Sequence, residues 1–201
     1  MTIPFVNTGI GSPQGRLLKA SFNTSIVRSA DSFESITCAS SVDATEIFLI
    51  PANTLVAPGD FVLLEIRGAC LNNTGVNRRP NIRLTLDTTL ICSPALGQVY
   101  VTATNPKPWL YTARIVLSSA TTANVWATQG QGNSQGAGSL PQGTQYGDLA
   151  TWSATGMFVR GIAFDPMVAH TLKAEGAWDA SNASLQINPM ERVMTAVRYS
   201  G

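Results

Sequence analysis

The stretch EIFLIPANTLVAPGDFVLLEIRGACLNNTG, residues 46–75, decides the fold class. Its apolar run at residues 47–50 stops at Pro51, and a turn at residues 57–60 then begins a second apolar run. This second run, residues 61–67, is rich in Val, Leu and Ile, which is typical of a β-strand between turns. Both of its alternating sets of side chains are largely apolar, so we expect a central strand that is covered on both faces.

The same alternation recurs along the chain. In NIRLTLDTTLI, residues 81–91, apolar Ile82, Leu84 and Leu86 alternate with polar residues. Further strands are expected at residues 17–27, 109–117, 124–128, 157–164, 171–178, 184–187 and 192–199. About eight to ten strands without a helical period predict an all-β fold. We expect an antiparallel β-sandwich of the jelly-roll type, because a parallel sheet would need crossover helices.

Composition favours a protein that associates with others. The 201 residues fit one all-β domain, and charged residues make up 12% of them, about half of the usual share. The net charge is +1, and the largest basic cluster is the pair Arg78 and Arg79, so a nucleic-acid partner is not expected. A weakly charged surface gives little protection against association, which is consistent with an oligomer.

Several other classes of protein are also disfavoured. The sequence has no apolar span of membrane length and no signal-peptide pattern, so we expect synthesis in a cytoplasm and no membrane insertion. Cys38, Cys70 and Cys92 match no metal or redox spacing, and their odd number favours buried free thiols. With one histidine and no nucleotide-binding glycine motif, no metal site and no cofactor are expected.

Two segments lack strand periodicity. Residues 1–14 contain Pro and Gly and are expected to form an extended N-terminal arm, ahead of a single sandwich domain of residues 15–201. Residues 129–147 are rich in Gly and Gln and are expected to form a long loop within that domain. The arm carries too many apolar residues for a solvated tail, so it is expected to lie against another surface. The candidate partner contacts in the two segments are Ile3, Phe5, Ile10, Gln131 and Tyr146.

A possible catalytic motif lies in the same loop. Residues 132–136, GNSQG, match the GxSxG pattern of a hydrolase, with Ser134 as nucleophile and His170 downstream. That pattern requires a helix directly after the serine, and the Gly/Gln sequence there cannot begin one. We therefore expect no enzyme and no catalytic residue. For His170 we expect a partly exposed position at the start of a strand.

The four tryptophans, Trp109, Trp126, Trp152 and Trp178, each lie in or beside a different predicted strand. This spacing favours core and interface packing, where aromatic residues are common. Two or three of them exposed in a row on one sheet would instead indicate stacking against sugars.

Two stretches carry a resemblance to a known family. Residues 50–75, together with the late hairpin KAEGAWDASNASLQIN of residues 173–188, resemble jelly-roll head-decoration (cement) or minor structural proteins of tailed bacteriophages. In that family an "IPANTL..GD" turn leads into a central strand, and a late strand ends in "W.AS.ASN". Here the late turn reads WDASNAS, with its Asn ahead of the second Ala-Ser.

The resemblance implies a mechanical function without cofactor, nucleic acid or membrane. It implies a homotrimer on the capsid surface that contacts the major capsid protein or other virion proteins and stabilises the shell. The arm and the loop would reach across neighbouring subunits. The alternative is a tail-associated receptor- or carbohydrate-binding module, which the tryptophan content suggests. Under the favoured hypothesis the late hairpin is scaffold.

Overall fold

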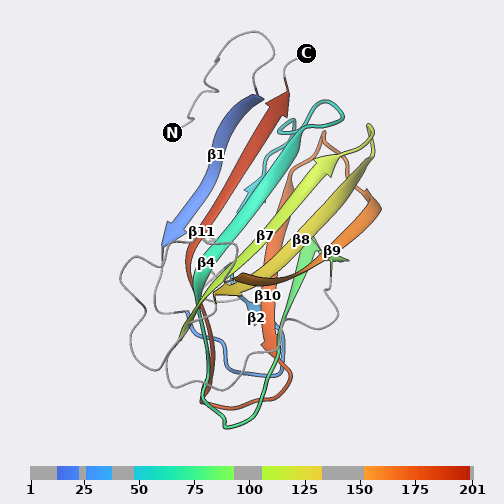
Figure 1. The fold of residues 1–201 in the computed structure, drawn as a ribbon. Helices are drawn as coiled ribbons and strands as arrows, with labels where there is room; N and C mark the ends of the chain where they lie inside the picture. Colours follow the sequence, from blue (N-terminus) through green and yellow to red (C-terminus); the bar gives the residue numbers. More distant parts are fainter. Residues whose placement is uncertain (1–12, 23–25, 38–47, 93–105, 133–151, 200–201) are drawn as a thin grey trace.

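Eleven β-strands and no helix form the described part of the protein (Figure 1). This computed structural model describes residues 13–22, 26–37, 48–92, 106–132 and 152–199. The strands are β1 (Pro13–Phe22), β2 (Glu34–Ser35), β3 (Phe48–Ile50), β4 (Phe61–Asn72), β5 (Pro80–Leu86), β6 (Thr89–Cys92), β7 (Lys107–Leu117), β8 (Thr122–Gly132), β9 (Trp152–Ala163), β10 (His170–Trp178) and β11 (Leu185–Tyr199). The predicted all-β class is confirmed.

The strands form two antiparallel sheets that pack against each other. Sheet A has six strands in the order β1-β11-β4-β7-β8-β9, which lie side by side in one layer in Figure 1. In sheet B, β10 pairs with β5 on one side and with β2 and β3 on the other, and β6 follows β5. One buried core joins Ile66 and Trp109 of sheet A to Ile82 and Trp178 of sheet B. The β-sandwich is therefore confirmed, whereas the jelly-roll connectivity stays a prediction.

Strand β4 has the central position that its sequence predicts. It pairs with β11 on one side and β7 on the other. Val62, Leu64 and Ile66 are fully buried between the sheets, and the alternate residues are half-buried on the outer face. The strand continues past residue 67 to Asn72, because the alternation persists through Cys70.

Strand β11 is one long strand where the sequence predicts two. Pro189 separates the expected strands 184–187 and 192–199, since a proline in an interior strand removes a ladder hydrogen bond. The structure accommodates it with a β-bulge, in which the register shifts between Pro189 and Glu191. Gly68 of β4 lies opposite Pro189. The bulged backbone passes so close to Gly68 that only a residue without a side chain fits there.

The segment 81–91 differs from its prediction in the opposite sense. It forms a hairpin of β5 and β6 instead of one strand, with Asp87 and Thr88 at the turn. Asp87 has a φ of 55°, a left-handed conformation that aspartate tolerates better than most residues. Its backbone N–H donates to the Thr171 carbonyl (2.7 Å), which fixes the turn against β10.

Two expected boundaries are also corrected. β1 begins at Pro13, so residues 13 and 14 of the expected arm belong to the sandwich, where they pair with β11. β8 extends to Gly132, so residues 129–132 of the expected loop are strand, and Gln131 lies opposite Trp109 and Ser153. The other calls on the arm and the loop lie outside the described residues. These are residues 1–12 and 133–151, with Ile3, Phe5, Ile10, Ser134 and Tyr146.

The turn that leads into β4 is held by the side chain of Asp60. The Asp60 carboxylate is fully buried and accepts hydrogen bonds from the backbone N–H groups of Val56 (2.9 Å), Ala57 (3.0 Å) and Tyr199 (3.0 Å). The Nε of Arg198 adds a bond to the Thr54 carbonyl (2.9 Å). The loop between β3 and β4 is thereby fastened to the end of β11.

The polar residues of the late hairpin bind the chain itself. The Ser181 hydroxyl donates to the Asp31 carboxylate (2.9 Å), and the Trp178 indole N–H donates to the Arg28 carbonyl (3.2 Å). The Asn182 side chain accepts the Ser184 backbone N–H (2.8 Å), as in an Asx turn. The bonds of Trp178 and Ser181 attach the hairpin to the segment that precedes β2.

The outer face of sheet B carries a compact ion-pair cluster around Glu175. The side chain of Glu175 is 7% exposed, and its carboxylate accepts from Arg83 Nε (2.6 Å) and Lys173 Nζ (2.7 Å). The Arg83 guanidinium also lies over the Phe33 ring, 4.4 Å from its centre. Burial raises the pKa of Glu175, but the hydrogen bonds and charges of Arg83 and Lys173 lower it more, so the pKa lies below its ordinary value of 4.5.

We predict that Glu175→Gln lowers the free energy of unfolding by about 2 kcal/mol near neutral pH, because it removes charge-assisted hydrogen bonds. Since folding lowers the pKa, the stabilisation is present above pH 4.5 and is lost as the pH falls through the folded-state pKa. Urea unfolding at a series of pH values should show the wild-type and variant curves converging in acid. Glu191→Gln, which alters an exposed pair with Arg67 (3.4 Å), is the control and should change little. A constant difference at all pH values would contradict this prediction.

Candidate functional site

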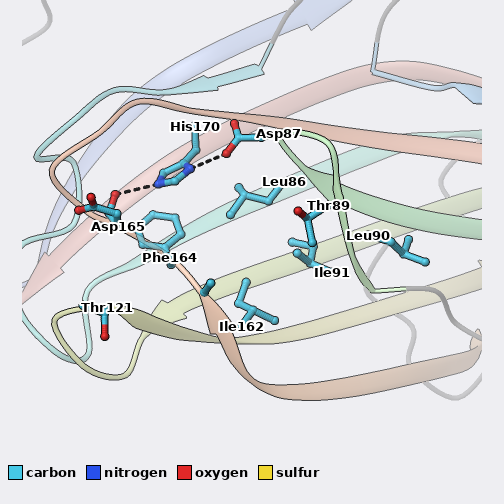
Figure 2. Close-up of a pocket in the computed structure, with 11 residues that line it drawn as sticks. Leu86, Asp87, Thr89, Leu90, Ile91, Thr121, Ile162, Phe164, Asp165 and His170 are labelled. Carbon is cyan, nitrogen blue, oxygen red and sulfur yellow. Dashed lines mark hydrogen bonds and ion pairs between the residues drawn. The ribbon is translucent and has the colours of Figure 1, made fainter.

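A cavity of about 430 Å³ opens beside His170, at the end of the sandwich where β6 and β9 lie (Figure 2). Its wall is mainly apolar; Asp87 and Asp165 flank His170, and Thr89 and Thr121 lie apart from these three residues. The lining residues are Leu86, Asp87, Thr89, Leu90, Ile91, Thr121, Ile162, Ala163, Phe164, Asp165 and His170.

Both ring nitrogens of His170 are engaged. Nδ1 lies 2.8 Å from Asp87 Oδ2, and Nε2 lies 2.8 Å from the Asp165 backbone carbonyl oxygen (Figure 2). The other Asp87 oxygen accepts the Thr171 backbone N–H (2.8 Å). Desolvation raises the pKa of Asp87, but the hydrogen bonds from His170 and Thr171 and the His170 charge lower it more. In this structure His170 ties the β5–β6 turn to the loop before β10.

The prediction for His170 is thus half correct. The residue begins β10, as expected, but it is buried (6% exposed) because it packs against the Phe164 ring, 4.5 Å between centres. A general base in a hydrolase needs one ring nitrogen free to take the proton of the nucleophile. Here Nε2 already binds a main-chain carbonyl, and Ser134 lies outside the described residues.

The described cysteines and the other potential metal ligands form no reactive or metal-binding site. Cys70 and Cys92 are buried and are not part of a disulfide, as predicted, and burial raises the pKa of Cys92 to about 11. Cys38 lies outside the described residues. Within the described ranges, no group of three or more His, Cys, Asp or Glu side chains is placed to hold a metal ion.

The outer face of sheet A carries a second candidate site, which we call the aromatic–arginine row. Every second residue of a strand points to this face, and neighbouring strands place such residues opposite each other: Leu63, Arg114, Trp126 and Phe158 are paired in this order from β4 to β9. In strand order, the row consists of Tyr199, Phe61, Arg114, Trp126, Phe158 and Arg160.

Planar groups in the row stack on their neighbours. The Trp126 and Phe158 rings are 4.4 Å apart and nearly parallel, at 24°. The Arg114 guanidinium lies 3.8 Å from the centre of the Phe61 ring, and that of Arg160 lies 5.2 Å from the centre of the Phe158 ring. Because Trp126 and Phe158 stack across adjacent strands, each ring covers one face of the other. Both side chains remain about 40% exposed.

The tryptophans divide between core and surface. Trp109 and Trp178 are fully buried, which confirms the packing interpretation for these two. Trp126 is 41% exposed in the aromatic–arginine row. The side chain of Trp152 lies outside the described residues, so Trp126 is the exposed tryptophan of the described part.

Comparisons with known proteins give no information about the role of this row. No family model matches the chain, and no curated protein or solved structure matches it either. The function is therefore inferred from the geometry and the chemistry of the residues. A search of the described residues for a helix long and apolar enough to cross a membrane finds none.

Sequence reasoning did not single out Arg114, Phe158 or Arg160. The period-2 alternation within β7 and β9 is enough to place each of them on the outer face. It does not give the pairing between strands, and only the register brings Arg114, Trp126 and Phe158 together.

Proposed function

We propose that the protein is a structural protein of a bacteriophage virion, a capsid decoration (cement) protein that binds the head surface as a homotrimer and stabilises the shell. The observation that carries the proposal is the outer face of sheet A, a broad β-surface that exposes Trp126, Phe158 and Tyr199 beside arginines. Aromatic residues and arginine are enriched at protein interfaces, whereas lysine and glutamate are depleted. The low charge of the chain and the resemblance of residues 50–75 and 173–188 support the same assignment.

In this proposal the protein acts by binding its neighbours in the shell and holding them in place. The protein is made in the host cytoplasm and joins the major capsid protein or other virion proteins on the capsid surface, without a cofactor, nucleic acid or a membrane. Each trimer presents the same surface three times, so weak contacts add up through high effective concentration. The proposed contacts are Ile3, Phe5 and Ile10 of the arm, Tyr146 of the loop, and Gln131 near the end of β8.

The proposal is tested with the purified full-length chain. Light scattering should give the mass of a trimer, and the protein should co-sediment with heads of the phage that encodes it after those heads have been stripped of it. Images of virions with and without the protein should differ by density on the capsid. A monomer that does not co-sediment with heads would contradict the proposal.

A tail-associated receptor- or carbohydrate-binding module is the second candidate. The exposure of Trp126 and Phe158 on one sheet face favours it, because aromatic side chains bind sugars as well as proteins. Binding on a glycan array that Trp126→Ala abolishes and Trp109→Phe preserves would support this function. An array without binding would count against it.

A further inference from the structure

Three arginines of the sandwich share one arrangement, in which the guanidinium lies over an aromatic ring. Arg83 lies over Phe33 on sheet B, and Arg114 and Arg160 lie over Phe61 and Phe158 on sheet A. Arg83 also binds a carboxylate, that of Glu175, at 2.6 Å. Arg114 and Arg160 are exposed, and neither forms an ion pair within the described residues. In the Arg83 site a carboxylate completes an arrangement that Arg114 and Arg160 have only in part.

The chemistry of the guanidinium group explains why a carboxylate fits. Stacking on a ring uses the flat face of the group and leaves its N–H donors, which point outward in the plane, available for hydrogen bonds. A carboxylate accepts two such bonds side by side, and this pairing is stronger than one between neutral groups. Stacking also fixes the position of the guanidinium, so less side-chain entropy is lost when a carboxylate binds.

The other charges on this face do not satisfy the two arginines. Glu65 and Glu191 are both engaged with Arg67, at 3.3 and 3.4 Å. Arg114 and Arg160 therefore leave two uncompensated positive charges at the β7–β9 end of the face. Among the described residues, the same face of a second copy would bring two more arginines, and its carboxylates Glu65 and Glu191 are already paired with Arg67. Like charges oppose such a contact, so the occupant has to be a different, acidic surface.

The aromatic rings between the two arginines indicate whether that acidic surface belongs to a protein or to a sugar. A sugar stacks on the face of an aromatic ring, but Trp126 and Phe158 each cover one face of the other, and the Arg160 guanidinium also lies over the Phe158 ring. The exposed parts of the two rings can pack against aliphatic and aromatic side chains, as in the centre of a protein interface.

We propose that the aromatic–arginine row binds an acidic protein surface, in which carboxylates pair with Arg114 and Arg160 and apolar side chains pack on Trp126 and Phe158. This inference rests on the proposed virion function, because the acidic surface then belongs to another virion protein. The row, rather than the arm alone, becomes a main attachment surface.

The test is co-sedimentation of the full-length protein with stripped heads, at about 0.1 M and about 1 M salt, where charges interact over about 10 Å and about 3 Å. The variant Arg114→Gln/Arg160→Gln should bind about tenfold or more weakly than the wild type at low salt, and its binding should depend less on salt. The control Arg78→Gln/Arg79→Gln removes the same charge from the β4–β5 connection, at the other end of β4, and should bind like the wild type. Urea unfolding should show that both variants are folded.

Each outcome separates the two proposals. If the wild type does not bind heads, the proposed function is wrong. If the wild type and both double variants bind equally well, or both variants lose binding equally, the function stands and the role of the row is overturned. A change of oligomer mass in Arg114→Gln/Arg160→Gln would assign the row to a second copy instead. Wild-type binding to acidic glycans that this variant loses would also overturn a protein partner.

Discussion

Gly68→Ala is expected to lower the free energy of unfolding by about 3 kcal/mol or more, since overpacking a well-packed site typically costs 1–3 kcal/mol and occasionally more. A Cβ at Gly68 would lie 1.9 Å from the Asn188 carbonyl oxygen and 3.0 Å from the Met190 backbone nitrogen. Both atoms belong to the backbone of the β11 bulge, so neither can move without breaking the ladder between two interior strands. Urea-induced unfolding followed by tryptophan fluorescence measures the change.

Gly15→Ala is the matched control for this prediction. Gly15 also lies in a strand of sheet A, but a Cβ built there meets no atom within 4 Å. Its backbone does not have a positive φ, so alanine should be tolerated or slightly stabilising. Equal effects of the two substitutions would show that loss of glycine itself, and not contact with the bulge, matters.

Asp60→Ala is expected to cost a similar amount, about 3 kcal/mol or more. It would leave the N–H groups of Val56, Ala57 and Tyr199 without their acceptor, and each unsatisfied buried group costs about 1–3 kcal/mol. Water can reach part of the loop, so the sum is smaller than three full penalties. The unfolding midpoint in urea and the protection of the Tyr199 amide against hydrogen exchange measure the effect.

Two further substitutions make the test of Asp60 specific. Asp60→Asn keeps one accepting oxygen and should have an intermediate effect. Asp179→Ala removes an exposed aspartate whose ion pair with Arg78 is long, at 3.9 Å, and should change stability little. If Asp60→Ala were as mild as Asp179→Ala, the carboxylate would not be what holds the turn.

The sequence is sufficient to predict the elements that depend on local pattern. Alternation identifies β4, and its two apolar faces predict that it is interior, as its pairing with β11 and β7 confirms. The same reasoning finds β7, β8 and β10 within a few residues of their bounds. Each of these strands has a period of two and ends at a Gly, Pro, Asn or Ser turn, which needs no knowledge of tertiary contacts.

Elements that depend on distant contacts are not predictable in this way. Pro189 indicates a strand end until the bulge opposite Gly68 is known, and Asp87 has none of the glycine signals of a hairpin. Likewise, nothing near His170 in the chain indicates Asp87, 83 residues away, as its partner. The aromatic–arginine row unites five strands and depends on register, which sequence periodicity leaves open.

The position of β11 in sheet A has a consequence for biosynthesis. β11 separates β1 from β4, and β1 has no other strand partner among the described residues. A nascent chain on the ribosome therefore holds β1 unpaired until residues up to Tyr199 have left the exit tunnel. Closing this pair spans nearly the whole sequence, which makes it a slow, late event in folding. Until β11 pairs, the edges of β1 and β4 that face it stay exposed, so the molecule should be most vulnerable to aggregation, and most dependent on chaperones, before β11 has docked.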